Sequence, residues 1–194
     1  MRLNCNINGS QYSLVVNSDK PLSQILNEQI PTFAQNSQCL GASCGNCIVL
    51  INGNAALSCL VPAFKLNGAS ILTFEGFQKT RFCHDIERAY ADVGNQPCPQ
   101  CYPSKTVIIE SILNKMDKEN HSRISGFNIM KGNEAPSGAN EQAARSRTGS
   151  GSMDAEMIAR EMAMSSCQCI EVSDLEKIIN LAYKYRSRRR ARRS

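Results

Sequence analysis

Residues 39–47 read Cys-Leu-Gly-Ala-Ser-Cys-Gly-Asn-Cys, which places Cys39, Cys44 and Cys47 in the spacing C-x4-C-x2-C. A fourth cysteine, Cys59, follows after eleven intervening residues. Glycine reaches positive φ at low cost and short polar residues tolerate tight turns, so this composition favours a loop whose backbone N–H groups turn inward. The stretch therefore predicts a tight loop lined by cysteines, with one further thiol supplied from nearby in the sequence.

This spacing is typical of plant-type two-iron, two-sulfur (2Fe-2S) clusters, in which three thiolates lie on one loop and a fourth lies further along the chain. We therefore predict that the four cysteines hold a 2Fe-2S cluster and that the chain transfers electrons. Zinc sites usually contain paired C-x2-C units, which the C-x4-C step does not match. A zinc site and a set of buried free thiols stay open as alternatives.

A second group of cysteines lies in the C-terminal half of the chain. Cys98 and Cys101 form a C-x2-C pair, and Cys167 and Cys169 form a C-x-C pair. If antiparallel helices bring the two pairs together, they supply the four thiolates that one more 2Fe-2S cluster needs. Zinc or unliganded thiols are the alternatives for this group. Two complete sets would use eight of the ten cysteines.

The composition limits the class of protein. The chain has 194 residues, enough for one medium domain or two small ones. Its ten cysteines are fewer than a disulfide-dense secreted scaffold of this length contains. No apolar stretch follows the N-terminus, and no apolar run approaches the length of a membrane span. These features predict a cytoplasmic protein without a membrane span, in a reducing compartment where thiols serve metals or catalysis.

The positive net charge of +5 belongs to the C-terminal end alone. Residues 184–194 contain seven basic side chains, so the rest of the chain sums to a net charge of −2. Such a tail could bind nucleic acid, anionic lipid or an acidic surface. No aromatic residues lie among its arginines after Tyr185, and no nucleic-acid-binding motif precedes it. We therefore predict a solvated, disordered tail at 185–194 and no nucleic-acid partner.

The first part of the chain reads as a small sheet with one helix. Strands are predicted at residues 3–7 and 12–16, joined by an Asn-Gly turn, and a helix is predicted to begin at Pro21. After the cysteine loop, strands are predicted at 48–51, from the next Asn-Gly turn to Cys59, and at 71–74. We therefore predict a sheet with one helix packed across it and the cysteine loop at its edge.

After Gly76 the pattern becomes helical. Apolar residues recur at helical spacing in 85–91, 105–118, 154–164 and a last helix from Ser173. Residues 132–152 contain no Val, Ile, Leu, Met or aromatic residue, which predicts a flexible insertion. The expected organisation is α+β, with an N-terminal domain at 1–77, a helical domain at 78–184 and the basic tail at 185–194.

The chain resembles the small iron–sulfur subunit of molybdenum hydroxylases of the xanthine dehydrogenase, aldehyde oxidoreductase and carbon monoxide dehydrogenase type. The shared segments occur in the family's order: residues 39–49, 58–60, 73–76, 84–90, 98–103 and 167–169. The resemblance implies a β-grasp, plant-type ferredoxin domain followed by an all-α, four-helix domain, each with one 2Fe-2S cluster. It implies an outer cluster held by Cys39, Cys44, Cys47 and Cys59, and an inner cluster beside the molybdopterin held by Cys98, Cys101, Cys167 and Cys169.

The sequence departs from the family pattern around the inner cysteines. Family members usually carry a glutamine near the pterin, directly before the first cysteine of the C-x2-C pair. Here Pro97 occupies that position and Gln96 lies one residue earlier, so Gln96 is the candidate pterin contact. Thr-Pro-Gly after the pair is replaced by Tyr102-Pro103-Ser104. These differences indicate a divergent branch of the family.

The resemblance implies a protein that conducts electrons and has no substrate-converting site of its own. Electrons would pass from a molybdopterin centre in a larger subunit, through the two clusters, to a flavin in an FAD-binding subunit or domain or to another acceptor. Two other hypotheses follow from the residues alone: a free-standing, single-cluster 2Fe-2S ferredoxin with a helical appendage, and a zinc-stabilised interaction module.

Overall fold

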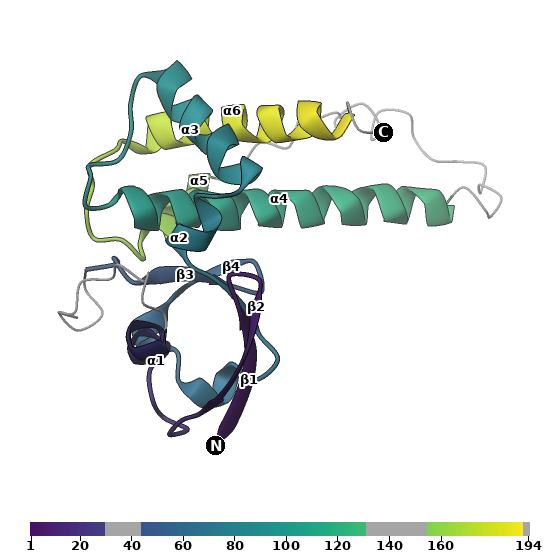
Figure 1. Ribbon diagram of the computed structural model, residues 1–194. Helices are drawn as coiled ribbons and strands as arrows, with labels where there is room; N and C mark the ends of the chain where they lie inside the picture. Colours follow the sequence, from purple (N-terminus) through teal and green to yellow (C-terminus); the bar gives the residue numbers. More distant parts are fainter. Residues whose placement is uncertain (30–43, 131–154, 192–194) are drawn as a thin grey trace.

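The computed structural model describes residues 1–29, 44–130 and 155–191 (Figure 1). Cys39 and the insertion predicted at 132–152 lie outside these residues. Within them the chain forms a mixed α+β structure in which five strands make one sheet. The strands are β1 (Arg2–Ile7), β2 (Ser10–Val15), β3 (Ile48–Ile51), β4 (Asn54–Leu57) and β5 (Ser70–Leu72).

The sheet has the strand order β2-β1-β5-β3-β4. The pair β1 and β5 is parallel, and the other neighbours are antiparallel. The two predicted Asn-Gly turns are confirmed, because Asn8 and Asn52 have φ values of 52° and 51° and each precedes a glycine with positive φ. This left-handed backbone is what a two-residue hairpin requires. The second hairpin joins β3 to β4 and leads directly to Cys59.

Strand β3 is buried on both faces. Ile48 and Leu50 belong to the apolar core shared with the C-terminal helices, whereas Val49 belongs to a core on the opposite face. Successive side chains of a strand point to opposite faces, so this alternation puts the strand between two cores. The second core includes Leu22, Ile25 and Leu26 of helix α1 (Leu22–Gln29). The predicted packing of one helix across the sheet is therefore confirmed.

Five further helices follow the sheet: α2 (Phe74–Phe77), α3 (Arg81–Val93), α4 (Tyr102–Met130), α5 (Ala155–Met162) and α6 (Val172–Ala191). Helices α3 and α4 extend beyond the ranges predicted from apolar spacing. Phe74 was expected to end a strand, but it begins α2, whose Phe77 is buried in the helical core. Two short 3₁₀ turns, η1 (Ser58–Leu60) and η2 (Ala63–Lys65), connect β4 to β5.

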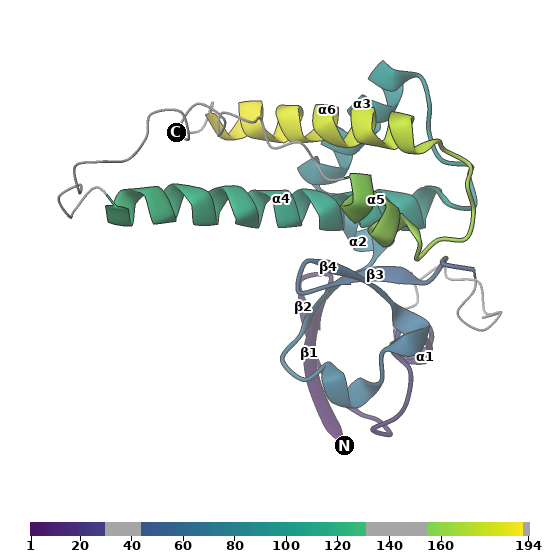
Figure 2. The ribbon, with the colours of Figure 1, turned by 180° about the vertical axis from the view of Figure 1, so that it is seen from behind.

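Helix α4 is the centre of the helical part. Figures 1 and 2 show it lying between the sheet and the helices α3 and α6. All residues from Ser104 to Leu113 are buried, which is expected for a helix covered on every side. Ser111 Oγ accepts a hydrogen bond from Ala55 N at 2.9 Å, and Asn114 Nδ2 donates to Gly53 O at 3.2 Å. These two bonds fix α4 on the β3–β4 hairpin.

The basic end of the chain is part of the fold, so the prediction of a disordered tail is wrong as far as Ala191. Helix α6 continues to Ala191, and Arg186 is only 1% exposed. Its guanidinium pairs with Glu110 and, at 3.2 Å, with Asp117, both on α4. Basic residues in this stretch bind neighbouring helices, which a charge count does not reveal. The boundary expected at 184/185 therefore falls inside a helix.

Other arginines of α6 reinforce this attachment. Arg190 pairs with Asp117 at 2.7 Å, and Arg189 pairs with Asp85 of α3 at 2.5 Å. The guanidinium groups of Arg186 and Arg189 lie 4.5 Å and 5.0 Å from the centre of the Phe82 ring. Arginine suits such a site because its planar group pairs with carboxylates and stacks on aromatic faces. The C-terminal charges thus hold α6 against α3 and α4.

No helix in the described part of the chain is both long enough and apolar enough to cross a bilayer.

Candidate metal centre

Four cysteine thiols of the helical part converge on one site. The Sγ atoms of Cys98, Cys101, Cys167 and Cys169 all lie within 4.8 Å of one another. Cys101 is buried and the other three are partly exposed. The predicted meeting of the C-x2-C and C-x-C pairs is therefore observed, although 65 residues separate Cys101 from Cys167. We call these four residues the inner cysteine group.

Two polar contacts join the two segments of this group, and a third fixes the first segment locally. Cys98 N donates a hydrogen bond to Cys169 Sγ at 3.5 Å. Asn95 Nδ2 donates to Asp174 Oδ2 at 2.9 Å, which links the residues before Cys98 to the start of α6. Ser104 Oγ donates to Cys101 O at 3.0 Å. The thiols are therefore held close together by the surrounding backbone and side chains.

The thiols of the inner cysteine group differ in acidity. Hydrogen bonding from the Cys101 backbone N–H lowers the pKa of Cys98 to about 7. Burial raises the pKa of Cys101 to about 12 and also raises the pKa of Cys169. A metal binds the thiolate form, so binding releases protons from the buried thiols. The arrangement is that of a metal-ligand set, and within the described residues no histidine joins the four thiols as it would beside a catalytic cysteine.

Two of the N-terminal cysteines, Cys47 and Cys59, lie together at the edge of the sheet. Cys47 Sγ and Cys59 Sγ lie 3.3 Å apart, and Cys44 is partly buried on the same loop. Ser58 N donates to Cys47 O at 2.9 Å, and the η1 turn then presents Cys59. We call Cys44, Cys47 and Cys59 the outer cysteine group. The structure thus brings Cys47 and Cys59 together across the eleven residues that separate them in the sequence.

The two sites touch through Gly45. Its φ is +68°, and a Cβ atom at this position would overlap the backbone of Met164 and lie 2.6 Å from Ser165 Cα. Gly45 lies between two cysteines of the outer group, and Ser165 lies two residues before Cys167. The glycine in the sequence predicted a turn, but not the segment at Met164 and Ser165 that packs against it. The loops that carry the two thiol groups are therefore in direct contact.

We expect Gly45→Ala to reduce the free energy of unfolding by more than the same change at Gly68. Gly68 has a similar φ of +74°, but no heavy atom lies within 4 Å of a Cβ built there. Both variants carry the left-handed strain, roughly 1–2 kcal/mol, and only Gly45→Ala adds an overlap with backbone, a further ~1–3 kcal/mol. Denaturant unfolding of both variants measures the difference. Equal losses would show that the contact contributes nothing.

Buried hydroxyl groups lie beside both thiol sites. Ser58 Oγ, adjacent to Cys59, and Ser165 Oγ, near Cys167, are buried without a hydrogen-bond partner in the described structure. Buried polar atoms are normally paired, so each of these hydroxyl groups has a hydrogen bond left to give to a bound acceptor. Sulfur atoms of an iron–sulfur cluster are acceptors of this kind. The residues present therefore fit such a group at both sites.

The remaining candidates lie outside the thiol groups. Gln96 is exposed on the segment that leads to Cys98. Cys5 and Cys83 are buried at 2% and 0% exposure in the two apolar cores, and burial raises the pKa of both thiols. They behave as small core residues. Tyr90 of α3 and Thr106 of α4 share a buried hydrogen bond of 3.1 Å that apolar spacing did not predict.

Comparison with known proteins agrees with this geometry. Residues 10–88 match the model of a 2Fe-2S iron–sulfur cluster binding domain. The chain is 34% identical over 113 residues to the xanthine dehydrogenase iron–sulfur-binding subunit of Escherichia coli O157:H7, an alignment that covers 58% of this chain and 70% of that protein.

Two solved structures have the same fold. Aldehyde oxidoreductase from Desulfovibrio gigas matches with a TM-score of 0.66 and 18% identity, over 97% of this chain and 17% of that one. Quinoline 2-oxidoreductase from Pseudomonas putida 86 matches with a TM-score of 0.62 and 21% identity, over 97% of this chain and 96% of that one.

The sequence match covers more than two thirds of the E. coli subunit, and the thiol sites and fold are consistent with it. The chain is therefore a 2Fe-2S-binding member of the family of small iron–sulfur subunits of xanthine dehydrogenase-like molybdenum hydroxylases.

Proposed function

We propose that this electron-transfer subunit carries two 2Fe-2S clusters and relays electrons between them. The outer cluster is held by the outer cysteine group together with Cys39, and the inner cluster by the inner cysteine group. One observation carries the proposal: the loops bearing the two thiol groups meet at Gly45, Met164 and Ser165. A zinc-stabilised module or a single-cluster ferredoxin would not need two four-cysteine sets whose loops touch.

The protein's own residues determine how well the relay conducts. A bound 2Fe-2S cluster accepts and releases one electron, with a potential set by charge, hydrogen bonds to sulfur and solvent exposure. Here Cys98 N points at Cys169 Sγ, and the hydroxyl groups of Ser58 and Ser165 are free to donate to sulfur. Burial of Cys47 and Cys101 limits access of water. No general acid or base is required for this function.

The route we propose begins in a larger, molybdopterin-binding subunit. Electrons enter at the inner cluster and leave through the outer cluster. Gln96, which precedes Cys98 by two residues, is the proposed contact to the pterin. The acceptor is a flavin in an FAD-binding subunit or domain, or another electron acceptor. Support comes from the names of relatives as subunits and from the aldehyde oxidoreductase chain, of which this chain spans 17%. We place the complex in the cytoplasm, where free thiols persist.

We further propose that each cluster has its own domain. Residues 1–77 form a β-grasp, ferredoxin-like domain with the outer site, and residues 78–191 form a four-helix domain with the inner site. Two apolar cores support this division, one between the sheet and α1 and one among α3, α4, α5 and α6. The second core also includes Ile48 and Leu50, so the domains share β3 as their boundary.

Iron and sulfide analysis with low-temperature electron paramagnetic resonance tests the proposal. The full chain, purified without oxygen from a host that assembles such clusters, should contain about four irons and four sulfides and give two distinct signals on reduction. About two irons and a single signal would instead indicate the single-cluster ferredoxin. A colourless product containing zinc would indicate the interaction module.

A further inference from the structure

Two buried hydroxyl groups without a hydrogen-bond partner lie at the outer loop, residues 44–47. Ser58 is 0% exposed and Ser165 is 6% exposed, and the Oγ atom of neither has a partner within the described structure. The other buried residues with a hydroxyl group in that part of the chain are all paired: Thr73, Tyr90, Ser104, Thr106 and Ser111. Native proteins pair nearly all of their buried polar atoms, so these two exceptions need an acceptor.

The sheet places Ser58 beside Cys47. Ile48 pairs with Leu57 in the β3–β4 hairpin, and Ser58 N donates to Cys47 O at 2.9 Å, so the ladder continues for one more pair. Residues directly opposite each other in an antiparallel pair share a face, with Cβ atoms about 4.5–5.5 Å apart. Ser58 also precedes Cys59, whose Sγ lies 3.3 Å from Cys47 Sγ. The hydroxyl group of Ser58 is therefore next to the outer cysteine group.

Ser165 reaches the same loop from the C-terminal half of the chain. A Cβ atom built on Gly45 would lie 2.6 Å from Ser165 Cα, so the two backbones are in direct contact. Gly45 lies between Cys44 and Cys47 in the chain, and it permits this approach because it has no side chain. A serine hydroxyl is only two bonds from its Cα. In every staggered rotamer, Ser165 Oγ therefore stays close to the outer loop.

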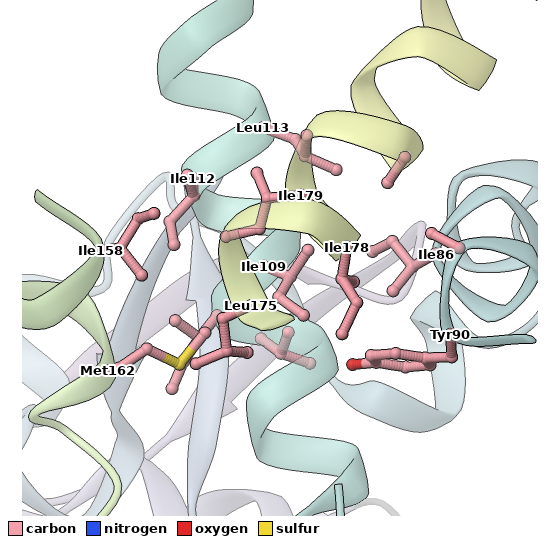
Figure 3. Packing of buried hydrophobic residues seen from close by; sticks show 14 of the residues in the cluster. Ile86, Tyr90, Ile109, Ile112, Leu113, Ile158, Met162, Leu175, Ile178 and Ile179 are labelled. Atoms are coloured by element: carbon pink, nitrogen blue, oxygen red, sulfur yellow. The ribbon is translucent and has the colours of Figure 1, made fainter. Parts of the chain in front are cut away.

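The turn that carries Ser165 is held by the helical core. Ser165 N donates to Met162 O at 3.0 Å, and Met162 is 8% exposed at the end of α5. Figure 3 shows the Met162 side chain among the buried residues of this core. Ser166, the next residue, is exposed, so the turn buries one serine and leaves the other in solvent. The position of Ser165 against Gly45 is thus fixed by the packing of α5.

The acceptor that fits both hydroxyl groups is the sulfur of a cluster held by the outer cysteines. Hydrogen bonds to sulfur are one of the factors that set the potential of an iron–sulfur cluster. We propose that Ser165, a residue of the helical part, donates its hydroxyl hydrogen bond to the outer cluster, as Ser58 does from the sheet. Sequence position alone suggests the opposite, because Ser165 precedes the inner ligand Cys167 by two residues. This inference rests on the proposed two-cluster function.

The sign of the effect follows from electrostatics. Reduction adds one negative charge to the cluster, and hydrogen bonds to charged acceptors are stronger than those to neutral ones. A donated hydrogen bond therefore stabilises the reduced cluster more than the oxidised cluster and raises its potential. Loss of the Ser165 hydroxyl should lower the potential of the outer cluster. The inner cluster should keep its potential, because the donor at Cys98 N remains on Cys169 Sγ.

Potentiometric titration of the full chain, followed by electron paramagnetic resonance of each cluster, tests the inference. The outer signal is the one that Cys47→Ser removes. We expect Ser165→Ala to change the oxidised-to-reduced ratio of the outer cluster about threefold at a fixed potential, which at 59 mV per tenfold is roughly 30 mV to lower potential. Ser58→Ala should shift the same signal in the same direction. Ser166→Ala is the matched control, because it removes an exposed hydroxyl from the same turn, and it should shift neither signal.

Electron–nuclear double resonance of the reduced protein detects the hydrogen bond itself. The outer signal should show coupling to a proton that exchanges in D2O, and this coupling should be absent from Ser165→Ala and present in Ser166→Ala. An unchanged outer potential, a shift confined to the inner cluster, or an outer shift with the coupling retained would overturn the inference. If Ser165→Ala loses the outer cluster, retention in Ser165→Thr supports the inference and loss in both overturns it. Fewer than two clusters in the unaltered protein would refute the proposed function instead.

Discussion

On the proposed two-cluster assignment, a chain carrying Cys101→Ser should lose about half of its iron and one of the two expected paramagnetic signals. Cys101 is 4% exposed, and its Sγ lies within 4.8 Å of the other three thiols, so the substitution leaves the inner cysteine group with three thiols. The metal ligand is the thiolate, and the hydroxyl of serine does not supply an equivalent anion near neutral pH. Cys47→Ser should remove the other signal. Iron content and resonance spectra of both variants measure the effect.

Cys83→Ser provides the control for this prediction. Cys83 is equally buried, at 0% exposure, but its Sγ contacts Glu87 at 3.8 Å and belongs to neither cysteine group. Its substitution should retain all of the iron and both signals, whatever it does to stability. Full iron content in Cys101→Ser would contradict the ligand assignment. An equal loss of iron in Cys83→Ser would show that damage to the core accounts for the effect.

Arg186→Met should reduce the free energy of unfolding by about 3–5 kcal/mol, the usual cost of leaving one member of a buried ion pair alone. The change leaves Glu110 buried at 4% exposure without its cation. Burial already raises the pKa of Glu110 to about 7, and Arg186 opposes that rise. Without Arg186 the folded-state pKa rises further above the unfolded value. The stability of the variant should therefore fall as the pH increases, and its loss should be smaller at pH 5 than at pH 8.

Arg188→Met is the matched control, because Arg188 is exposed two residues further along α6. A surface change of this kind is expected to cost less than about 0.5 kcal/mol. The double variant Arg186→Met/Glu110→Gln should recover much of the loss, since replacing both members of a buried pair is often nearly neutral. Denaturant unfolding at the two pH values provides the measurement. Equal losses in Arg186→Met and Arg188→Met would mean that the pairing does not stabilise the fold.

The spacing of cysteines and turn residues was enough to predict much of this molecule. Asn8 and Asn52 predicted both hairpins, because Asn-Gly strongly favours the left-handed backbone of a two-residue turn. Cys98, Cys101, Cys167 and Cys169 predicted a shared site, because metal centres need several thiolates at one point. The turns depend on adjacent residues, and the shared site could be predicted despite the 65 residues between Cys101 and Cys167 because cysteine pairs at ligand spacing indicate a metal site.

Features that depend on tertiary neighbours could not be predicted in the same way. The arginines of α6 look like a solvated tail until Glu110 and Asp117 are found opposite Arg186. Lys105 looks like the exposed residue of an amphipathic helix until α4 is found to be covered on every side. Gly45 suggests a turn, but only the structure reveals Met164 and Ser165 against it. In each case the partner lies far away in the sequence.

The contact at Gly45 also has a consequence for biosynthesis. A ribosome releases the N-terminal part of a chain first, and domains generally fold as units in that order. On the proposed ligand sets, the outer cysteines are complete once Cys59 has emerged, whereas the inner set needs Cys169. Met164 and Ser165 reach Gly45 only in that last stage. On a chain still being synthesised, the outer loop is therefore not yet covered by Met164 and Ser165, and it becomes covered only when the C-terminal part has folded.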